Sequence, residues 1–129
     1  MIPPRFAEPV YALFRIVFGV LFVMHGLQKM VGMFGGLGGH AVPLGSMLGI
    51  ASIIECTTGT LIVLGLFTRY AAFLASGLMA VAYFTAHQPN GGVPLQNMGE
   101  PAVMNCFAFL YMAVRGSGPY SVDAAIGRR

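Results

Sequence analysis

Charged side chains are scarce in this sequence of 129 residues: Asp, Glu, Lys and Arg together make up 9% of it, whereas hydrophobic residues make up 57%. Soluble domains carry about 25% charged residues. A soluble protein of this size could not cover its surface with so few charges, but a lipid bilayer solvates an apolar exterior. The composition predicts an integral membrane protein whose main partner is the lipid bilayer, with residues 1–129 forming a single membrane domain.

The sequence also lacks a concentrated basic surface. The formal net charge is +3, but the seven Lys and Arg residues are scattered and are not interleaved with aromatic residues. This distribution argues against a nucleic-acid partner. It is typical of cations that orient a chain in the membrane.

The common chemical motifs are missing as well. The two cysteines, Cys56 and Cys106, form neither a CxxC pair nor a metal-ligand spacing. We expect them to remain unbridged, because helical rises place Cys106 about 8 Å above Cys56, whereas a disulfide needs Cα atoms within about 7 Å. There is no glycine-rich dinucleotide loop, P-loop, HExxH or Ser-His-Asp constellation, so no metal, ATP or dinucleotide site is predicted.

The sequence does contain four apolar stretches. They predict helices at about residues 9–33, 44–66, 70–86 and 101–115, separated by short or glycine- and proline-rich connections. The second is long enough to cross ~30 Å of hydrocarbon, and the fourth is the shortest at about 21 Å. We expect an all-α fold, an integral membrane four-helix bundle with an uncleaved first helix. One further short turn is expected after Ser121.

The cations are distributed unequally between the two ends of the predicted helices. One end holds Arg5, Arg15, Arg69, Arg115, Arg128 and Arg129, and the other holds Lys29. The positive-inside rule then predicts that both termini are cytoplasmic and that the chain is a multi-pass protein of the cell (inner) membrane. Arg69 is expected to serve as a cytoplasmic anchor or in an ion pair.

Glu55 lies near the middle of the second predicted helix. An ionisable group there costs at least ~2.5–3.5 kcal/mol, so it is expected to face the bundle interior and to contact Arg15 or His25 of the first helix. Small residues beside it would let the helices approach closely; they are Gly45, Gly49, Ser52, Cys56 and Gly59. Two interpretations remain open: a glutamate that binds a ligand or proton, and one that only pins two helices together.

Further polar residues approach the membrane interior from the outer end. Arg15, His25 and Lys29 share an arc of about 80° on the first helix. Lys29 is expected to be a snorkelling anchor, and Arg15 is expected either to pair or to snorkel. Residues from three helices could line an outward-facing polar pocket. The complete candidate intramembrane site is Arg15, His25, Lys29, Glu55, Tyr83, His87 and Glu100.

Several segments together resemble the DoxX family of small bacterial membrane proteins. They are RIVFGVLFVMHGLQK at residues 15–29, Glu55 followed by GTLIVLGLFTRYAA at 59–72, NMGEPAV at 97–103 and GSGPYSVD at 116–123. The chain reads NMGE where the family commonly has NGGE. The resemblance implies a four-helix membrane bundle, with the family's recurring polar positions at Arg15, His25, Lys29, Glu55, Arg69 and Glu100. It also implies membrane redox chemistry, as an oxidoreductase subunit or as a quinone- or thiol-linked partner.

Three functions follow as alternatives. The chain could be a subunit that works with a soluble or membrane redox enzyme and holds a quinone, with His25, Glu55 or Tyr83 exchanging protons. It could instead be a proton, ion or solute permeation component built from several copies as a homo-oligomer. The third alternative is a non-catalytic assembly factor that docks a soluble enzyme. Whether the chain is itself an enzyme stays open, because the sequence has no cofactor motif.

Overall fold

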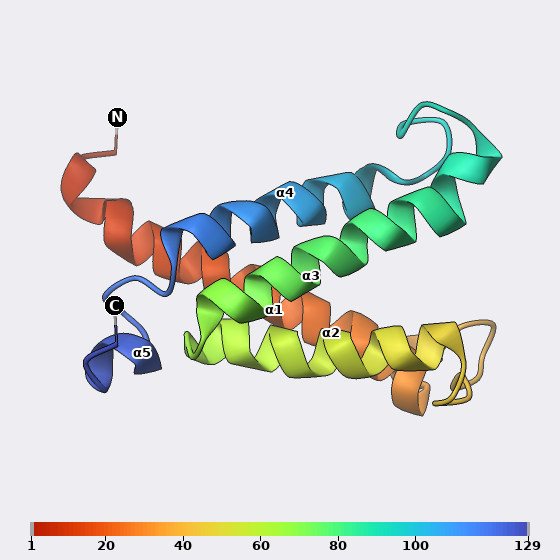
Figure 1. Cartoon of the computed structure of the whole chain (residues 1–129), viewed down its shortest axis with the longest axis horizontal. Helices are drawn as coiled ribbons and strands as arrows, with labels where there is room; N and C mark the ends of the chain where they lie inside the picture. The colour runs from red at the N-terminus through yellow and green to blue at the C-terminus, as the bar shows by residue number, and fades with distance from the viewer. Residues whose placement is uncertain (1, 129) are drawn as a thin grey trace.

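The computed structural model describes residues 2–128, and within that range all regular structure is helical apart from one isolated bridge between Leu37 and His40 (Figure 1). The all-α expectation is therefore confirmed. The helices are α1 (Ala7–Val31), α2 (Met47–Leu64), α3 (Thr68–Ala82), α4 (Glu100–Arg115) and the short α5 (Val122–Ala125). The last of these is the turn expected after Ser121, whose side chain accepts a hydrogen bond from the N–H of Ala124.

Local chemistry explains where the first two helices begin and end. A 3-10 turn at Pro4–Phe6 leads into α1, since proline suits a helix start. Gly32 has a φ of 72°, and this left-handed conformation ends α1 two residues earlier than the sequence predicted. The Ser46 side chain caps α2 by accepting the N–H of Gly49, so that helix begins at Met47 rather than at 44.

The third helical run is longer than expected. α3 continues through a π turn at Tyr83–His87 and a 3-10 turn at Gln88–Asn90. Three stretches of the described chain are long and apolar enough to cross a membrane: Pro4–Val31, Met47–Leu64 and Thr68–Asn90. α4 has 16 residues and a length of about 24 Å. Four membrane crossings therefore remain a prediction.

α1 packs closely along α2, and α3 packs along α4 (Figure 1). A Cβ atom on Gly19 would lie 2.9 Å from the carbonyl oxygen of Gly59, and one on Gly59 would lie 2.9 Å from that of Gly19. Only glycine permits this approach. The predicted packing role of the small residues is confirmed for Ser52, Cys56 and Gly59. Gly49 is also buried, but the backbone that it packs against is that of Pro43 and Leu44 before α2, not that of another helix. The packing role is wrong for Gly45, where a Cβ would have nothing within 4 Å.

Aromatic side chains join α1 to α4. The ring of Phe109 lies 4.7 Å from that of Phe22 and 6.2 Å from that of Phe18, centroid to centroid. Phe22 and Phe109 are buried, while Phe73 and Phe107 are 69% and 65% exposed on the outside. Large apolar side chains on both the inside and the outside are what a lipid-facing bundle requires.

Both chain ends lie at one end of the molecule, and the two long connections lie at the other (Figure 1). The α1–α2 pair and the α3–α4 pair diverge toward the end with the connections. Side chains at the two ends of the molecule therefore have different surroundings, and we describe the ends separately below.

Candidate functional site

Glu55 faces the interior of the helix assembly, as predicted, and is 1% exposed. The expected partner was wrong: its Oε1 atom lies 2.5 Å from Nζ of Lys29, and neither Arg15 nor His25 contacts it. The antiparallel packing explains the difference, because Gly26 lies against Ser52 and Cys56. Lys29 is therefore close enough for its long side chain to reach the carboxylate, and it is not a snorkelling anchor.

The second carboxylate oxygen of Glu55 has no hydrogen-bond partner in the described structure. The two side chains differ in their exposure, with Lys29 at 17% and Glu55 at 2%. Buried acceptors are usually satisfied, because an unpaired one costs free energy. This pair therefore has a free acceptor beside a cation that reaches the edge of the helix pair.

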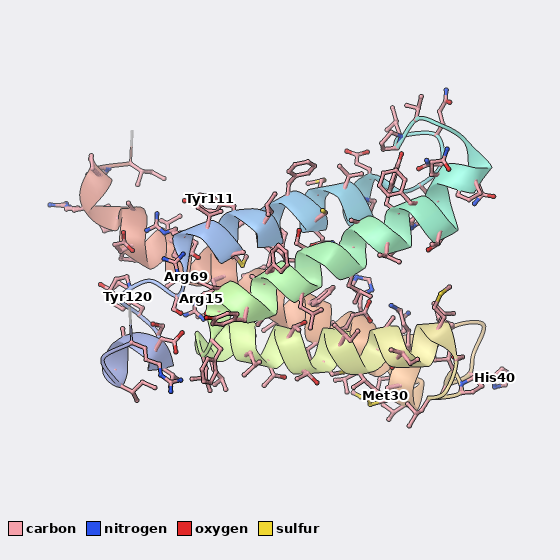
Figure 2. The ribbon with its side chains drawn as sticks, viewed as in Figure 1. Arg15, Met30, His40, Arg69, Tyr111 and Tyr120 are labelled. Carbon is pink, nitrogen blue, oxygen red and sulfur yellow. The ribbon has the colours of Figure 1, made fainter. Side chains whose placement is uncertain are left out.

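Arg15 lies at the end of the molecule with the chain termini, where it binds carbonyl oxygens rather than a carboxylate (Figure 2). Its guanidinium donates to the carbonyl oxygens of Ile62 and Val63, in the last turn of α2, and to that of Tyr120 in the C-terminal tail (residues 116–128). The Val63 and Tyr120 contacts measure 2.8 and 2.7 Å. The last carbonyls of a helix have no partner within it, and a cation satisfies them. Both expectations for Arg15, pairing with Glu55 and snorkelling, are wrong, because it is 1% exposed.

Arg69 donates hydrogen bonds to the end of α4 in the same way. Its guanidinium donates to the carbonyl oxygen of Val114 at 2.5 Å, with longer contacts to those of Ala113 and Arg115. Within residues 2–128 it forms no ion pair, so the interpretation that remains is an anchor. Arg115, in the same turn of α4, pairs with Glu8 at 2.5 Å and lies over the ring of Tyr11 at 4.1 Å.

Asp123 lies at the N-terminal end of α3. Its carboxylate accepts a hydrogen bond from Ser117 at 2.5 Å, and its backbone N–H donates to Gly65. Burial alone would raise its pKa, but the Ser117 hydroxyl, the amides of Phe67 and Thr68 and the charge of Arg128 lower the pKa below its ordinary value. A carboxylate is stabilised at the positive end of a helix dipole.

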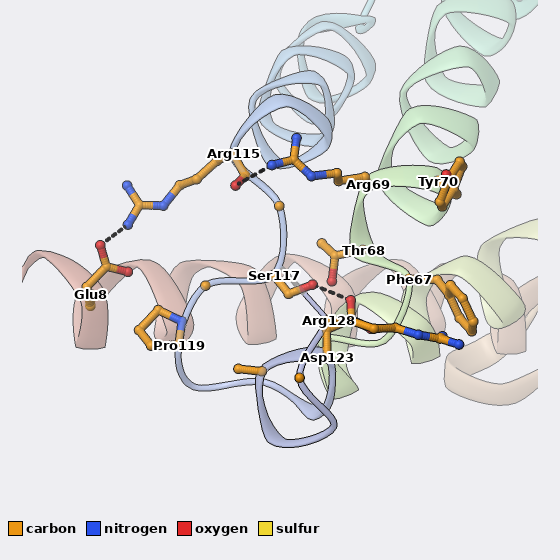
Figure 3. Close-up of a pocket in the computed structure, with 14 residues that line it drawn as sticks. Glu8, Phe67, Thr68, Arg69, Tyr70, Arg115, Ser117, Pro119, Asp123 and Arg128 are labelled. Atoms are coloured by element: carbon orange, nitrogen blue, oxygen red, sulfur yellow. Dashed lines mark hydrogen bonds and ion pairs between the residues drawn. The ribbon is translucent and has the colours of Figure 1, made fainter.

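These groups surround an open recess of about 1340 Å³ (Figure 3). The recess lies between the start of α1, the start of α3, the end of α4 and the tail. Its charged lining residues are Glu8, Arg69, Arg115, Asp123 and Arg128. Three arginines face two carboxylates here, so the recess is polar with an excess of positive charge.

The polar pocket expected at the other end does not assemble. Tyr83 and His87 both contact Asn97, whose carbonyl oxygen lies 3.3 Å from Nδ1 of His87 and whose amide donates to the Tyr83 hydroxyl at 3.4 Å. Glu100 is exposed. These residues belong to the α3–α4 pair, which diverges from α1 at this end (Figure 1). Lys29 is turned toward Glu55 instead.

His25 is also separate from the other candidates. It is exposed, and it lines a shallow cavity of about 190 Å³ with Leu21, Met24, Gln28 and Phe34. An arc of 80° on one helix is wide enough to include both a buried and an exposed position. Within residues 2–128, no three His, Cys, Asp or Glu side chains are grouped to hold a metal ion, and both cysteines are free.

Two residues that form polar contacts at the two ends of the molecule were not predicted from the sequence. Asp123 lies in a polar tail, and its backbone N–H donates to the distant Gly65 carbonyl oxygen. Asn97 lies in a loop, and its side-chain amide donates to the carbonyl oxygen of Gly91 in the same loop. Asn97 also accepts the N–H of Gly99 at 2.8 Å, just before α4. Asparagine and aspartate in Gly-rich segments often form such local bonds, and this was the available signal.

Comparisons with known proteins give a consistent result. The DoxX family model matches residues 10–88. An uncharacterized protein of Haemophilus influenzae is 40% identical over 119 residues, which cover 87% of each chain. The inner membrane protein YqjF of Escherichia coli K12 is 28% identical over 120 residues, covering 89% of this chain and 90% of that protein. No solved structure matches the chain.

Proposed function

Because the chain belongs to the DoxX family of membrane proteins, we propose that it is a membrane-embedded subunit or partner of a redox system and that its terminal recess receives the partner. The redox assignment rests on the family resemblance. The recess is the observation that supports a partner role, since it is polar, open and formed at the ends of four separate segments.

The position of the recess favours a protein partner. It lies beyond the ends of α2 and α4, away from the apolar sides of the helices, so a soluble or membrane enzyme can approach it without entering hydrocarbon (Figure 3). Its excess of arginine complements an acidic surface, and charge complementarity increases the association rate and the specificity of such contacts. The electron carrier would belong to the partner.

The chain is a multi-pass protein of the inner membrane, like the E. coli relative. We propose four crossings with both termini in the cytoplasm. The shared location of the termini and the cluster of arginines around them support this orientation (Figure 1). Reporter fusions after Ile126 and within residues 88–96 test it: a cytoplasmic signal from the first and an external one from the second are expected. The same side for both would overturn it.

The partner role is tested by purifying the full chain from native membranes with mild detergent and identifying co-purifying proteins and lipid-soluble molecules by mass spectrometry. A redox enzyme should be recovered. Charge reversal of Arg128 in the recess should reduce that recovery about tenfold, the effect of 1.4 kcal/mol. Arg5→Glu is the matched control, because Arg5 lies outside the recess. Recovery without a redox protein, or equal loss in both variants, would contradict the proposal.

The Lys29–Glu55 pair favours a second candidate function, proton or cation permeation. The free acceptor of Glu55 and the partial exposure of Lys29 supply the observation. Proteoliposomes that contain wild-type protein should then show a flux that Glu55→Gln abolishes. Equal flux in wild type, Glu55→Gln and empty vesicles would exclude this function.

A further inference from the structure

The exposed side of α1 has two polar groups within its apolar surface. His25 is exposed and Gln28 is partly exposed, one turn apart, and they share the shallow cavity with Leu21, Met24 and Phe34. Neither side chain has a hydrogen-bond partner in the described part of the chain. Unlike Lys29, both therefore have their hydrogen-bonding groups free on the outside of the protein.

The depth of His25 makes this exposure costly. Its neighbour Gly26 lies against the backbone of Ser52 and Cys56 in α2. Those residues are between about 8 and 14 Å inside the helix from its start at Met47, by residue rise. His25 is thus level with the interior of a membrane-crossing helix, where polar side chains normally face protein rather than lipid.

A second copy of this chain can satisfy both groups. A neutral imidazole has one donor and one acceptor, and a carboxamide has both kinds of atom. Two copies related by a two-fold axis along the membrane normal keep the same orientation in the bilayer. In this arrangement residues at equal depth meet across the axis, so each His25 lies beside the His25 of the other copy. The long side chain of Gln28, one turn along α1, then reaches the other copy's His25, and symmetry forms this hydrogen bond twice. The hydrogen-bonding groups of His25 and Gln28 are then satisfied without any other polar group.

We propose that this face of α1 is a homodimer interface in the membrane, closed by reciprocal hydrogen bonds between His25 and Gln28 and by packing of Leu21 and Met24. Polar side chains commonly stabilise helix association in this way within bilayers. The interface lies at a different place from the terminal recess, so each copy of the dimer could still receive its own partner.

Disulfide cross-linking in native membranes tests the contact. In a background with both native cysteines replaced by alanine, Leu21→Cys and Met24→Cys should cross-link to a dimer when copper(II)-phenanthroline and oxygen accept the electrons. Ile16→Cys is the control, because Ile16 is exposed but points about 140° away from Leu21 and about 80° away from Met24 around α1. A product whose mass is that of two chains supports the proposal. A product with a different protein, or no difference from Ile16→Cys, overturns it.

A second measurement tests the polar pair itself. Energy transfer between labelled copies in vesicles should show that the His25→Leu, Gln28→Leu double variant dissociates about tenfold more readily, at roughly threefold for each hydrogen bond lost. Replacing Ile16, which is exposed and lies on the opposite side of α1 from His25, by leucine should leave association unchanged. Unaltered association of the polar double variant would overturn the proposal. A lipid-soluble molecule bound at His25, where the second copy is expected, would also overturn it.

Discussion

Lys29 and Glu55 are unequal partners, because the carboxylate is almost fully enclosed while the ammonium is 17% exposed. If Glu55 is removed, the lysine can extend toward the end of α1. If Lys29 is removed, the enclosed carboxylate cannot move out toward solvent and is left without its cation. The two single substitutions are therefore expected to differ.

The first prediction compares Lys29→Met, Glu55→Leu and the double variant. Breaking a buried ion pair typically costs ~3–5 kcal/mol, whereas replacing both partners by apolar residues costs little. Lys29→Met should lower thermal stability in detergent more than Glu55→Leu does, and the double variant should recover most of the loss. Strictly additive losses would show that the pair does not act as a unit.

The second prediction concerns Asp123 and pH. Its pKa is lowered in the folded protein, so the ionised form stabilises the fold. That contribution is fully present above the ordinary aspartate pKa of about 3.9 and is lost as pH falls through the lower, folded-state value. Asp123→Asn should destabilise the protein by about 1 kcal/mol at pH 7, measured as a shift in thermal midpoint.

The difference between wild type and Asp123→Asn should then narrow below about pH 4. The neighbouring Ser117→Ala variant provides a control for the hydroxyl, because it keeps the charge. A gap between wild type and Asp123→Asn that stays constant down to pH 3 would mean that the carboxylate charge is not what stabilises the start of α3.

At the scale of elements, the separation of α1 and α2 is set by glycine. A methyl group on Gly59 would meet Val23 Cγ2 at 2.8 Å and the backbone of Gly19 at 2.9 Å. The helices must move apart to admit it, which also lengthens the Lys29–Glu55 contact. The small-residue face therefore determines both the packing and the geometry of the ion pair.

The third prediction is that Gly59→Ala destabilises the protein by about 1–3 kcal/mol through overpacking. Gly77→Ala is the control, because a Cβ there meets nothing within 4 Å. Gly77→Ala should cause no loss of stability and can gain up to about 1 kcal/mol, because alanine favours a helix more than glycine does. The measurement is the folded fraction after heating in the same detergent. A similar loss in both variants would indicate a general effect of alanine rather than a steric one.

Charged side chains also stabilise the ends of helices. Arg15 donates hydrogen bonds to carbonyl oxygens at the end of α2, and Arg69 does so at the end of α4. The carboxylate of Asp123 lies at the start of α3. Each arginine donates to the terminal carbonyl oxygens of another segment, and the Asp123 charge is stabilised at the positive end of α3. These contacts connect α1 and the tail to helix ends far away in the sequence.

Across the whole molecule, the fourth prediction is that ending the chain after Pro119 removes two of these contacts, one to Tyr120 and one from Asp123. A hydrogen bond to a charged group contributes about 1.5–3 kcal/mol and a helix cap about 1 kcal/mol. We expect a loss of about 3 kcal/mol, visible as a lower thermal midpoint.

Ending the chain after Ile126 should have a much smaller effect, because Tyr120 and Asp123 are both kept. The two truncations therefore separate the contribution of these contacts from that of the remaining tail. Equal stability of the two truncated chains would contradict the role assigned to Tyr120 and Asp123.

Much of the molecule could be predicted from the sequence, because apolar runs and glycine breaks fix where helices form. The interior position of Glu55 followed from the cost of exposing it to lipid. Its partner did not, because depth was judged from the distance along each helix. The packing of Gly26 against α2 shifts that register, and a lysine side chain is long enough to reach back.

The positions of Arg15 and His25 could not be predicted for a related reason. Helical spacing gives an angle around α1, but it does not say which side the neighbouring helices cover. The structure buries Arg15 and leaves His25 exposed. Asp123 and Asn97 were missed because several of their partners are backbone groups, which every residue type supplies.

The contact between Arg15 and the carbonyl of Tyr120 joins positions 105 residues apart. Synthesis proceeds from the N-terminus, so Arg15 leaves the ribosome long before any of its acceptors exist. The guanidinium can bind the end of α2 once that helix has been made, and it can bind the tail only later, after Tyr120 has been made. The tail therefore completes this contact last, and a chain that stops before Tyr120 leaves one guanidinium donor of Arg15 without its acceptor.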